Sequence, residues 1–279
     1  MYQENITALK KDAPIGVFDS GIGGLTVARE IMRQIPNEKI IYFGDTARMP
    51  YGSKSKETVT GFSQQIVRFL ETFQVKTIVV ACNTASAYAL DELEKELDIP
   101  IIGVIKPGAK TAAEVTRNGR IGVIATEATI GSQMYNKYIQ ELNKNVTIYG
   151  KACPLFVPLV ENGYINEGNP VTRLVIADYL TELRDTGIDT LILGCTHYPL
   201  LTEIIADIMG PGVTLIDSGA AAARVLRQTL SDRGALAQRD HGTLTLYASD
   251  RPEDFGALAG QFLRRPLESA VQHVDIERY

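Results

Sequence analysis

The sequence predicts an α/β protein made of two similar domains, each a mostly parallel sheet with helices on both faces. Short apolar runs rich in Val and Ile alternate with longer segments of helical periodicity, which is the pattern of parallel strands joined by helices. A chain of 279 residues is long enough for two such domains. In addition, two of the strand segments recur in the same order in the second half of the chain.

The first elements along the chain show the alternation. We expect a strand at Pro14–Phe18, a helix at Leu25–Ile35 and a second strand at Lys39–Phe43. Further strands of the same apolar character are expected, most of them separated by amphipathic helices: Thr77–Ala81, Ile99–Val104, Arg120–Ala125, Val146–Tyr149, Thr190–Gly194, Gly212–Ile216 and Thr243–Ala248.

Self-similarity within the chain indicates an internal duplication. Residues Ile15–Ser20 align with Ile121–Thr126, and Thr77–Cys82 aligns with Thr190–Cys195 at nearly the same offset. In open parallel sheets, ligands bind just beyond the carboxyl ends of the strands. Each of the two segments Thr77–Cys82 and Thr190–Cys195 ends in a cysteine. If the two domains face one another, these two cysteines should therefore reach a common cleft from opposite sides.

Composition narrows the classes of function. Hydrophobic residues make up 45% and charged residues 22% of the chain, which is ordinary for a folded globular protein. The net charge of −5 and the absence of a long Lys/Arg run argue against nucleic acid or an anionic membrane as partner. No apolar stretch reaches the roughly 18 residues of a membrane span, and no signal-peptide core is present. We therefore expect a cytoplasmic protein.

Three cysteines occur in the sequence, at positions 82, 153 and 195. They are too few and too far apart for a disulfide framework or a CxxC metal site, so we expect thiols and no bound metal. Cys153 lacks a partner at the corresponding position of the other half, and we assign it to the core. The equivalent placement of Cys82 and Cys195 favours a functional role for these two.

A pair of equivalent thiols suits the inversion of a carbon centre. Inversion needs a base that removes a proton from one face and an acid that delivers a proton to the other face. The ordinary thiol pKa of about 8.5 lies nearer neutrality than that of a carboxyl or an ammonium group, so both protonation states are accessible. Asn83 and Thr84 follow Cys82, while Thr196 and His197 follow Cys195, and all four offer polar groups beside a thiol.

The glycine-rich segment Asp19–Gly24 follows a strand and precedes a helix, so its amides could hold an anion such as a substrate carboxylate. A dinucleotide-binding loop is the rival interpretation. Against it, Thr26 replaces the third glycine of that motif, and no acidic residue is well placed about 20 residues further on.

Several ordered motifs identify a resemblance over about residues 14 to 260. They are Val17–Gly24, Gly44-Asp45 through Pro50-Tyr51-Gly52, Ala81–Ala85, Pro158–Glu161 and Leu193–Pro199. Together they resemble the glutamate racemases, bacterial enzymes that supply D-glutamate for peptidoglycan. The resemblance implies two flavodoxin-like domains with the active site in the cleft between them. Their expected boundaries are 1–107 with 217–279 for the first domain and 108–216 for the second.

The resemblance also implies roles for individual residues. Cys82 would deprotonate D-glutamate with the assistance of Asp19, and Cys195 would deprotonate L-glutamate with the assistance of His197 and Glu161. Asp45 is a further supporting candidate. The amino acid would be bound by residues from four of the motifs: Asp19, Ser20, Tyr51, Gly52, Asn83, Thr84, Thr196 and His197. No cofactor is expected, and a homodimer is implied. The segments Met1–Ala13 and Glu268–Tyr279 fall outside the match and have no assigned role.

Three alternatives stay open. The two-thiol chemistry is indifferent to side-chain length, so the substrate could be aspartate or another acidic amino acid. The cleft could belong to a binding domain that senses an acidic metabolite, because open α/β folds serve many functions. A redox role for Cys82 and Cys195 is disfavoured because the two lack close spacing. No lysine lies in a recognisable Schiff-base motif, so pyridoxal phosphate is not expected.

Overall fold

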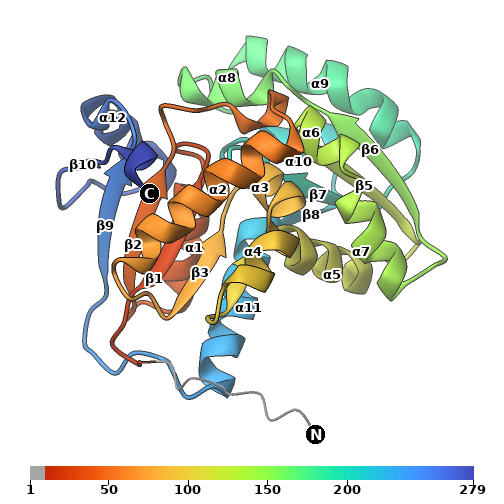
Figure 1. Ribbon diagram of the computed structural model, residues 1–279. Coiled ribbons are helices and arrows are strands. Elements are labelled where there is room, and N and C mark those ends of the chain that lie inside the picture. The colour runs from red at the N-terminus through yellow and green to blue at the C-terminus, as the bar shows by residue number, and fades with distance from the viewer. Residues whose placement is uncertain (1–9) are drawn as a thin grey trace, which may run out of the picture.

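The computed structural model describes residues 10–279, whose strands form two separate parallel sheets (Figure 1). The first sheet has the order β10-β9-β2-β1-β3-β4 and the second the order β6-β5-β7-β8. The strands of the first sheet are β1 (Ile15–Asp19), β2 (Lys39–Gly44), β3 (Thr77–Val80), β4 (Ile101–Gly103), β9 (Thr243–Ala248) and β10 (Gln272–His273). Those of the second sheet are β5 (Arg120–Ala125), β6 (Thr147–Ala152), β7 (Thr190–Gly194) and β8 (Thr214–Asp217).

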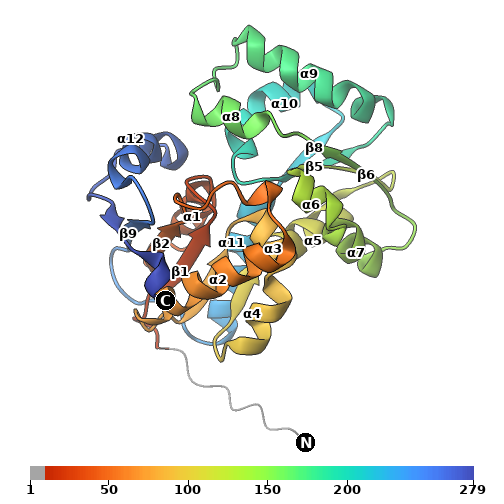
Figure 2. The same ribbon diagram turned by 45° about the horizontal axis from the view of Figure 1, so that its top comes forward.

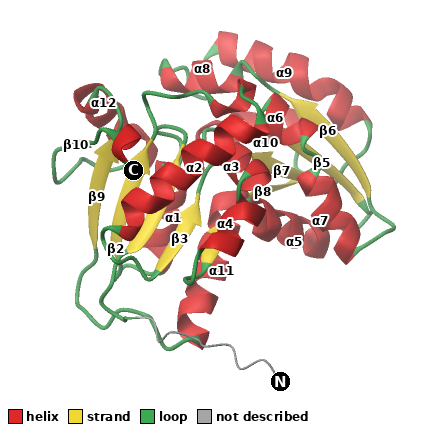
Figure 3. Cartoon of the chain, viewed as in Figure 1, coloured by secondary structure: helices red, strands yellow, loops and turns green. Residues whose placement is uncertain are grey.

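Helices cover both faces of each sheet (Figure 3). On the first sheet, α1 (Leu25–Gln34) and α12 (Pro252–Leu263) pack on one face, and α2 (Lys56–Glu71), α3 (Asn83–Tyr88) and α4 (Leu90–Glu96) pack on the other. On the second sheet, α5 (Ile105–Val115) and α7 (Met134–Leu142) oppose α8 (Phe156–Glu161), α9 (Pro170–Asp185) and α10 (Thr202–Met209). Both faces are therefore buried, which explains why these strands read as near-continuous apolar runs.

The two sheets repeat one topology, as the internal duplication predicts. The order β2-β1-β3-β4 matches β6-β5-β7-β8, so β1 corresponds to β5 and β3 to β7. The order reverses between β1 and β3 in the first sheet and between β5 and β7 in the second, which is where open α/β sheets bind ligands. We therefore expect a ligand-binding site at the segments that follow β1, β3, β5 and β7.

The chain crosses between the halves twice. The first crossing follows β4 through α5, and the second follows β8 through α11 (Ser218–Asp232), which packs against both α1 and α5 (Figure 2). The predicted domain boundaries at 107/108 and 216/217 fall within α5 and β8. The exact division at those positions stays a prediction.

The expected strands are all present, and most differ from the expectation by one or two residues at their ends. The strand expected at Val146–Tyr149 instead occupies Thr147–Ala152, because its second half is small or polar and gives no apolar signal. The two-residue strand β10 was not expected, since it carries no pattern. It lies in the C-terminal segment to which the sequence assigned no role, where Ile276 is also buried against the first sheet.

Most of Met1–Ala13, the other segment without an assigned role, lies outside the described residues. Within residues 10–279, every helix is too short or too polar to span a lipid bilayer.

Candidate active site

A cavity of about 350 Å³ lies between the carboxyl ends of the two sheets. Both halves of the molecule contribute to its wall, including both cysteines of the duplicated strands. It is lined by Ser20, Gly21, Met49, Pro50, Tyr51, Gly52, Ser53, Cys82, Asn83, Thr84, Thr126, Glu127, Cys153, Pro154, Val157, Pro158, Glu161, Cys195, Thr196 and His197. The structure thus brings together all the residues that the sequence analysis proposed for the site, except Asp19, which lies behind the wall.

Cys82 is positioned by the turn from β3 into α3. It is the N-terminal cap of that helix, and its Sγ accepts a hydrogen bond from the Ala85 N–H at 3.4 Å. The Ser20 hydroxyl lies 3.6 Å from the same sulfur. Burial and the negative charge of Asp19 raise the pKa of the Cys82 thiol to about 12, although the two hydrogen-bonding groups act in the opposite direction. At neutral pH, Cys82 therefore carries its proton.

Asp19 ends β1 and is almost completely buried, at 1% exposure. Its Oδ2 accepts a hydrogen bond from the Gly21 N–H at 3.1 Å, while its Oδ1 has no partner in the described structure. Burial raises the pKa of this carboxyl, and the charge of His197 and nearby backbone N–H groups oppose that shift. The Asp19 carboxyl, with one oxygen free to accept a hydrogen bond, thus lies directly behind the Cys82 side of the cavity.

The Asp19 side chain lies close to the amides of the glycine-rich loop. The N–H groups of Gly24, Gly21 and Ser20 interact with the Asp19 carboxylate. The first amides of α1 bond to the loop carbonyls; for example, Thr26 N–H donates to the Gly23 carbonyl at 3.0 Å. Asp19 therefore engages part of this helix terminus, and binding of a substrate carboxylate by the loop stays a prediction.

Cys195 follows β7 and lies beside an imidazole. Its Sγ is 3.9 Å from His197 Nδ1, and His197 Nε2 is 3.0 Å from Oε1 of Glu161. Burial opposes a charge on the ring, but the contacts with Cys195 and Glu161 outweigh it and raise the pKa of His197 to about 10. His197 is therefore positively charged at neutral pH, and a cation beside a thiol stabilises the thiolate.

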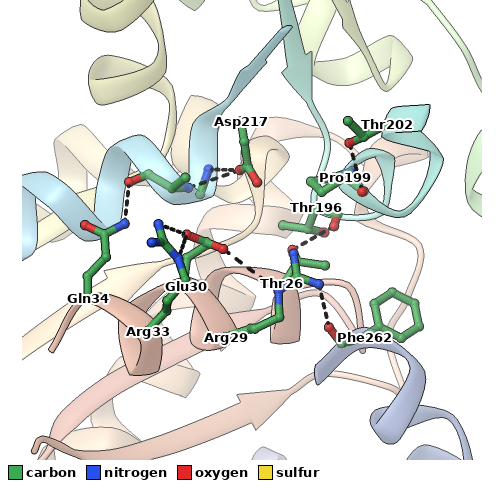
Figure 4. A network of polar contacts seen from close by, with 12 residues as sticks. Thr26, Arg29, Glu30, Arg33, Gln34, Thr196, Pro199, Thr202, Asp217 and Phe262 are labelled. Carbon is green, nitrogen blue, oxygen red and sulfur yellow. Dashed lines mark hydrogen bonds and ion pairs between the residues drawn. The ribbon is translucent and has the colours of Figure 1, made fainter. Parts of the chain in front are cut away.

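The loop after β7 is held against the glycine-rich loop of the other half. Thr26 Oγ1 donates to the Thr196 carbonyl at 2.8 Å, and Figure 4 shows this contact within the polar network around α1. A Cβ atom at Gly23 would lie 2.3 Å from Thr196 Oγ1 and 2.4 Å from His197 Nδ1. Because real Cβ contacts are never that short, the approach of the two loops requires glycine at this position.

Tyr51 is fixed by a buried carboxylate. Its hydroxyl donates a hydrogen bond to Asp45 Oδ2, which also accepts from Arg48 Nε at 2.7 Å. The other oxygen of Asp45 accepts from Ser249 Oγ at 2.9 Å. Asp45 thus acts on the cavity through Tyr51 and does not line it, which refines the supporting role that the resemblance suggested.

The sequence analysis assigned no site role to several residues of the wall, among them Thr126 and Cys153. Thr126 follows β5, where its hydroxyl lies 3.1 Å from that of Thr84, and it aligns with Ser20 in the duplication. That alignment could have revealed it. Cys153 is completely buried, as predicted for a core residue, but it also lines the cavity.

The side chains that line the cavity offer more hydrogen-bonding groups than positive charges. Among residues 10–279, no lysine or arginine lines it, and His197 is its cationic group. The same residues contain no cluster of three or more His, Cys, Asp or Glu side chains arranged to hold a metal ion. The hydroxyl and amide donors of the wall suit a small polar molecule with carboxylate groups.

Comparison with known proteins identifies the family of the chain. The family model Asp/Glu/Hydantoin racemase matches residues 15–226. A glutamate racemase of Geobacter metallireducens is 49% identical over 261 residues, which cover 92% of this chain and 95% of that protein.

Solved structures show the same similarity. A glutamate racemase isoform of Bacillus anthracis superposes with a TM-score of 0.91 at 43% identity and covers 95% of this chain and 98% of its own. The glutamate racemase of Francisella tularensis, solved in complex with D-glutamate, gives a TM-score of 0.89 at 40% identity, with 96% of this chain and all of that chain covered.

Proposed function

The chain belongs to the Asp/Glu/hydantoin racemase family and is an isomerase of its glutamate racemase branch, and we propose that it interconverts L-glutamate and D-glutamate with Cys82 and Cys195 as its acid and base. One observation gives the main support for this mechanism. Two buried thiols, at equivalent strand ends of the two halves, line one cavity. Such a pair can reach the α-carbon of a bound amino acid from opposite faces.

In each turnover one thiol must act as the base and the other as the acid. Cys195, beside the His197 cation, acts as the base and removes the α-proton of L-glutamate. Cys82, with its pKa raised to about 12, gives its proton to the opposite face of the resulting carbanion. D-Glutamate leaves, Cys195 now holds the proton and Cys82 is the thiolate. The reverse reaction begins from that state, and Asp19 assists Cys82 as His197 and Glu161 assist Cys195.

Substrate binding completes the proposal. The α-carbon of an amino acid is a far weaker acid than a thiol, so the site must stabilise the developing charge with oriented donors and exclude water. The groups proposed to hold the amino acid are Asp19, Ser20, Tyr51, Gly52, Asn83, Thr84, Thr196 and His197. Apart from Asp19, all of them line the cavity.

The cellular role is part of the same proposal. We propose that the enzyme works without a cofactor, in the cytoplasm and as a homodimer, and that its product supplies D-glutamate for peptidoglycan. The Cys82 and Cys195 pair needs no electron sink, which supports the absence of pyridoxal phosphate. An absorbance band from a bound cofactor would contradict the proposal that the enzyme works without one. A monomer in sedimentation analysis of the active enzyme would contradict the proposed homodimer.

The reaction is tested by incubating the purified protein with L-glutamate in deuterated water without added cofactor. We expect the circular dichroism of the amino acid to decay to zero while deuterium enters at the α-carbon. Turnover of L-aspartate in place of L-glutamate would move the substrate to the shorter acid. Binding of glutamate without turnover of either acid would favour a sensor domain.

The pH dependence tests the role of Glu161. Its carboxylate helps to keep His197 protonated, so Glu161→Gln should lower the pKa of His197 by about one unit or more. Because the imidazolium is lost as pH rises through that pKa, the alkaline limb of kcat for L-glutamate should move to lower pH by the same amount. Glu127→Gln removes another carboxylate of the cavity wall and should leave that limb in place. A Glu161→Gln profile that overlays the wild-type profile would contradict the proposed role.

A further inference from the structure

Asn83 is the cavity residue whose orientation matters most for binding, because the two ends of its amide have opposite chemistry. Its oxygen accepts hydrogen bonds and its NH₂ group donates them. The side chain is 97% buried, and its Nδ2 has no partner in the described structure. A buried donor without a partner is costly, so this one is expected to meet a ligand.

Tyr135 engages the oxygen end of the Asn83 amide. Its hydroxyl donates a hydrogen bond to Asn83 Oδ1 at 2.7 Å. Tyr135 belongs to α7 on the second sheet, whereas Asn83 opens α3 on the first, so this bond crosses between the two halves. With its oxygen engaged by the phenol, the amide leaves its NH₂ group without a partner in the described structure, beside the cavity that Asn83 lines.

The position of the Tyr135 ring is itself closely defined. The ring is 2% exposed and packs against two glycines, where Cβ atoms would lie 3.5 Å from it at Gly108 and 3.2 Å from it at Gly194. Gly194 directly precedes Cys195, and Asn83 directly follows Cys82. Tyr135 therefore joins the two cysteine-bearing segments. Burial raises the pKa of the Tyr135 hydroxyl above its ordinary value, so the hydroxyl keeps its proton at neutral pH.

We propose that Tyr135 is a positioning residue that orients the Asn83 amide across the interface, so that Asn83 donates its NH₂ hydrogen bond to a carboxylate of the substrate. This inference rests on the proposed glutamate racemase function and adds a residue to it. Tyr135 does not line the cavity within the described chain and acts only through Asn83. A ligand with an ammonium group in place of that carboxylate loses this contact, because an ammonium group cannot accept a hydrogen bond.

Tyr135→Phe removes the hydroxyl and keeps the ring. Without the phenol, the Asn83 amide is free to rotate and loses its bias toward donation. We expect KM for both enantiomers to rise on the order of tenfold, the size of one hydrogen bond to a charged group, while kcat changes less than about threefold. Tyr138→Phe is the matched control, because Tyr138 lies on the same helix but does not line the cavity. Its KM should equal the wild-type value.

A double-mutant cycle separates positioning from a general structural role. In an Asn83→Ala background, Tyr135→Phe should not raise KM further, because the residue through which it acts is gone. If Tyr135→Phe raises KM by the same factor in both backgrounds, the hydroxyl serves only the packing of the interface and the inference is overturned. Thermal unfolding followed by circular dichroism identifies any variant that has lost its fold.

Asn83→Asp is the second variant and does not depend on changes at Tyr135. It keeps an oxygen for the Tyr135 hydroxyl but offers the cavity a carboxylate oxygen in place of the NH₂ group. Two like charges then meet, so KM should rise more than in Tyr135→Phe. Unchanged KM in this variant would show that no donor is needed at Asn83. If the wild-type protein does not racemise glutamate at all, the proposed function fails, whereas normal wild-type turnover with unchanged variants removes only the role of Tyr135.

Discussion

Replacement of either Cys82 or Cys195 by alanine is expected to lower racemisation of glutamate by a factor on the order of 10³ or more. Each thiol supplies the proton transfer on one face, and a positioned acid or base contributes about 10² to 10⁴ to a rate. Since inversion needs both faces, neither remaining thiol can complete it alone. The loss should appear in both directions, because the ratio of the forward and reverse kcat/KM values is fixed by the equilibrium constant.

Proton exchange distinguishes the two faces where racemisation cannot. In deuterated water, Cys82→Ala retains the Cys195 side and should exchange the α-proton of L-glutamate without inverting it. Cys195→Ala should do the same with D-glutamate. Nuclear magnetic resonance of each enantiomer with each variant measures this, and exchange of the opposite enantiomers would reverse the assignment of faces.

Cys153→Ala is the control for these variants. This third thiol also borders the cavity, and burial raises its pKa to about 12 as it does that of Cys82. The corresponding position after β2 holds Asp45 and not a second thiol, however, and the Cys153 Sγ donates a hydrogen bond to the Lys151 carbonyl at 3.7 Å. Racemisation should stay within a few-fold of wild type. A loss comparable to that of Cys82→Ala would show that removal of any thiol from the wall is damaging and would undermine the pairing.

The central strands and the two thiols could be predicted because their signals are local. Buried parallel strands such as β5 and β7 must be apolar on both faces, so they appear as short Val/Ile-rich runs with clear ends. The duplication then placed Cys82 and Cys195 at equivalent strand ends. Thr126 was within reach of the same alignment, but a threonine after a strand is too common to be singled out.

Contacts between distant segments could not be predicted in this way. The pairing of His197 with Glu161 joins positions 36 residues apart, and only the resemblance connected them. The Tyr135 to Asn83 bond depends on how the two sheets face each other, which no local pattern encodes. The use of the glycine-rich loop depends on the fold in the same way. Its composition predicts available amides, and the fold places the Asp19 carboxyl beside several of them.

Gly23→Ala should be the most damaging substitution outside the reacting groups. The added methyl group would meet Thr196 Oγ1 and His197 Nδ1, and neither has room to retreat because Thr26 and Glu161 hold this loop from two sides. The loop must shift by a substantial fraction of an ångström. A misplacement of about 1 Å can cost 10²-fold in rate, so we expect kcat/KM to fall by about that factor.

The control is Gly61→Ala in α2, where a Cβ atom meets nothing within 4 Å. Since alanine is the better helix former by about 0.5 to 1 kcal/mol, this variant should unfold at a slightly higher temperature and racemise glutamate normally. Overpacking at Gly23 should instead lower the free energy of unfolding by about 1 to 3 kcal/mol. Thermal unfolding and glutamate kinetics of both variants decide the matter. If Gly23→Ala keeps its wild-type kcat/KM, the Cys195 loop tolerates displacement, and close contact between the two halves is not what aligns the second thiol.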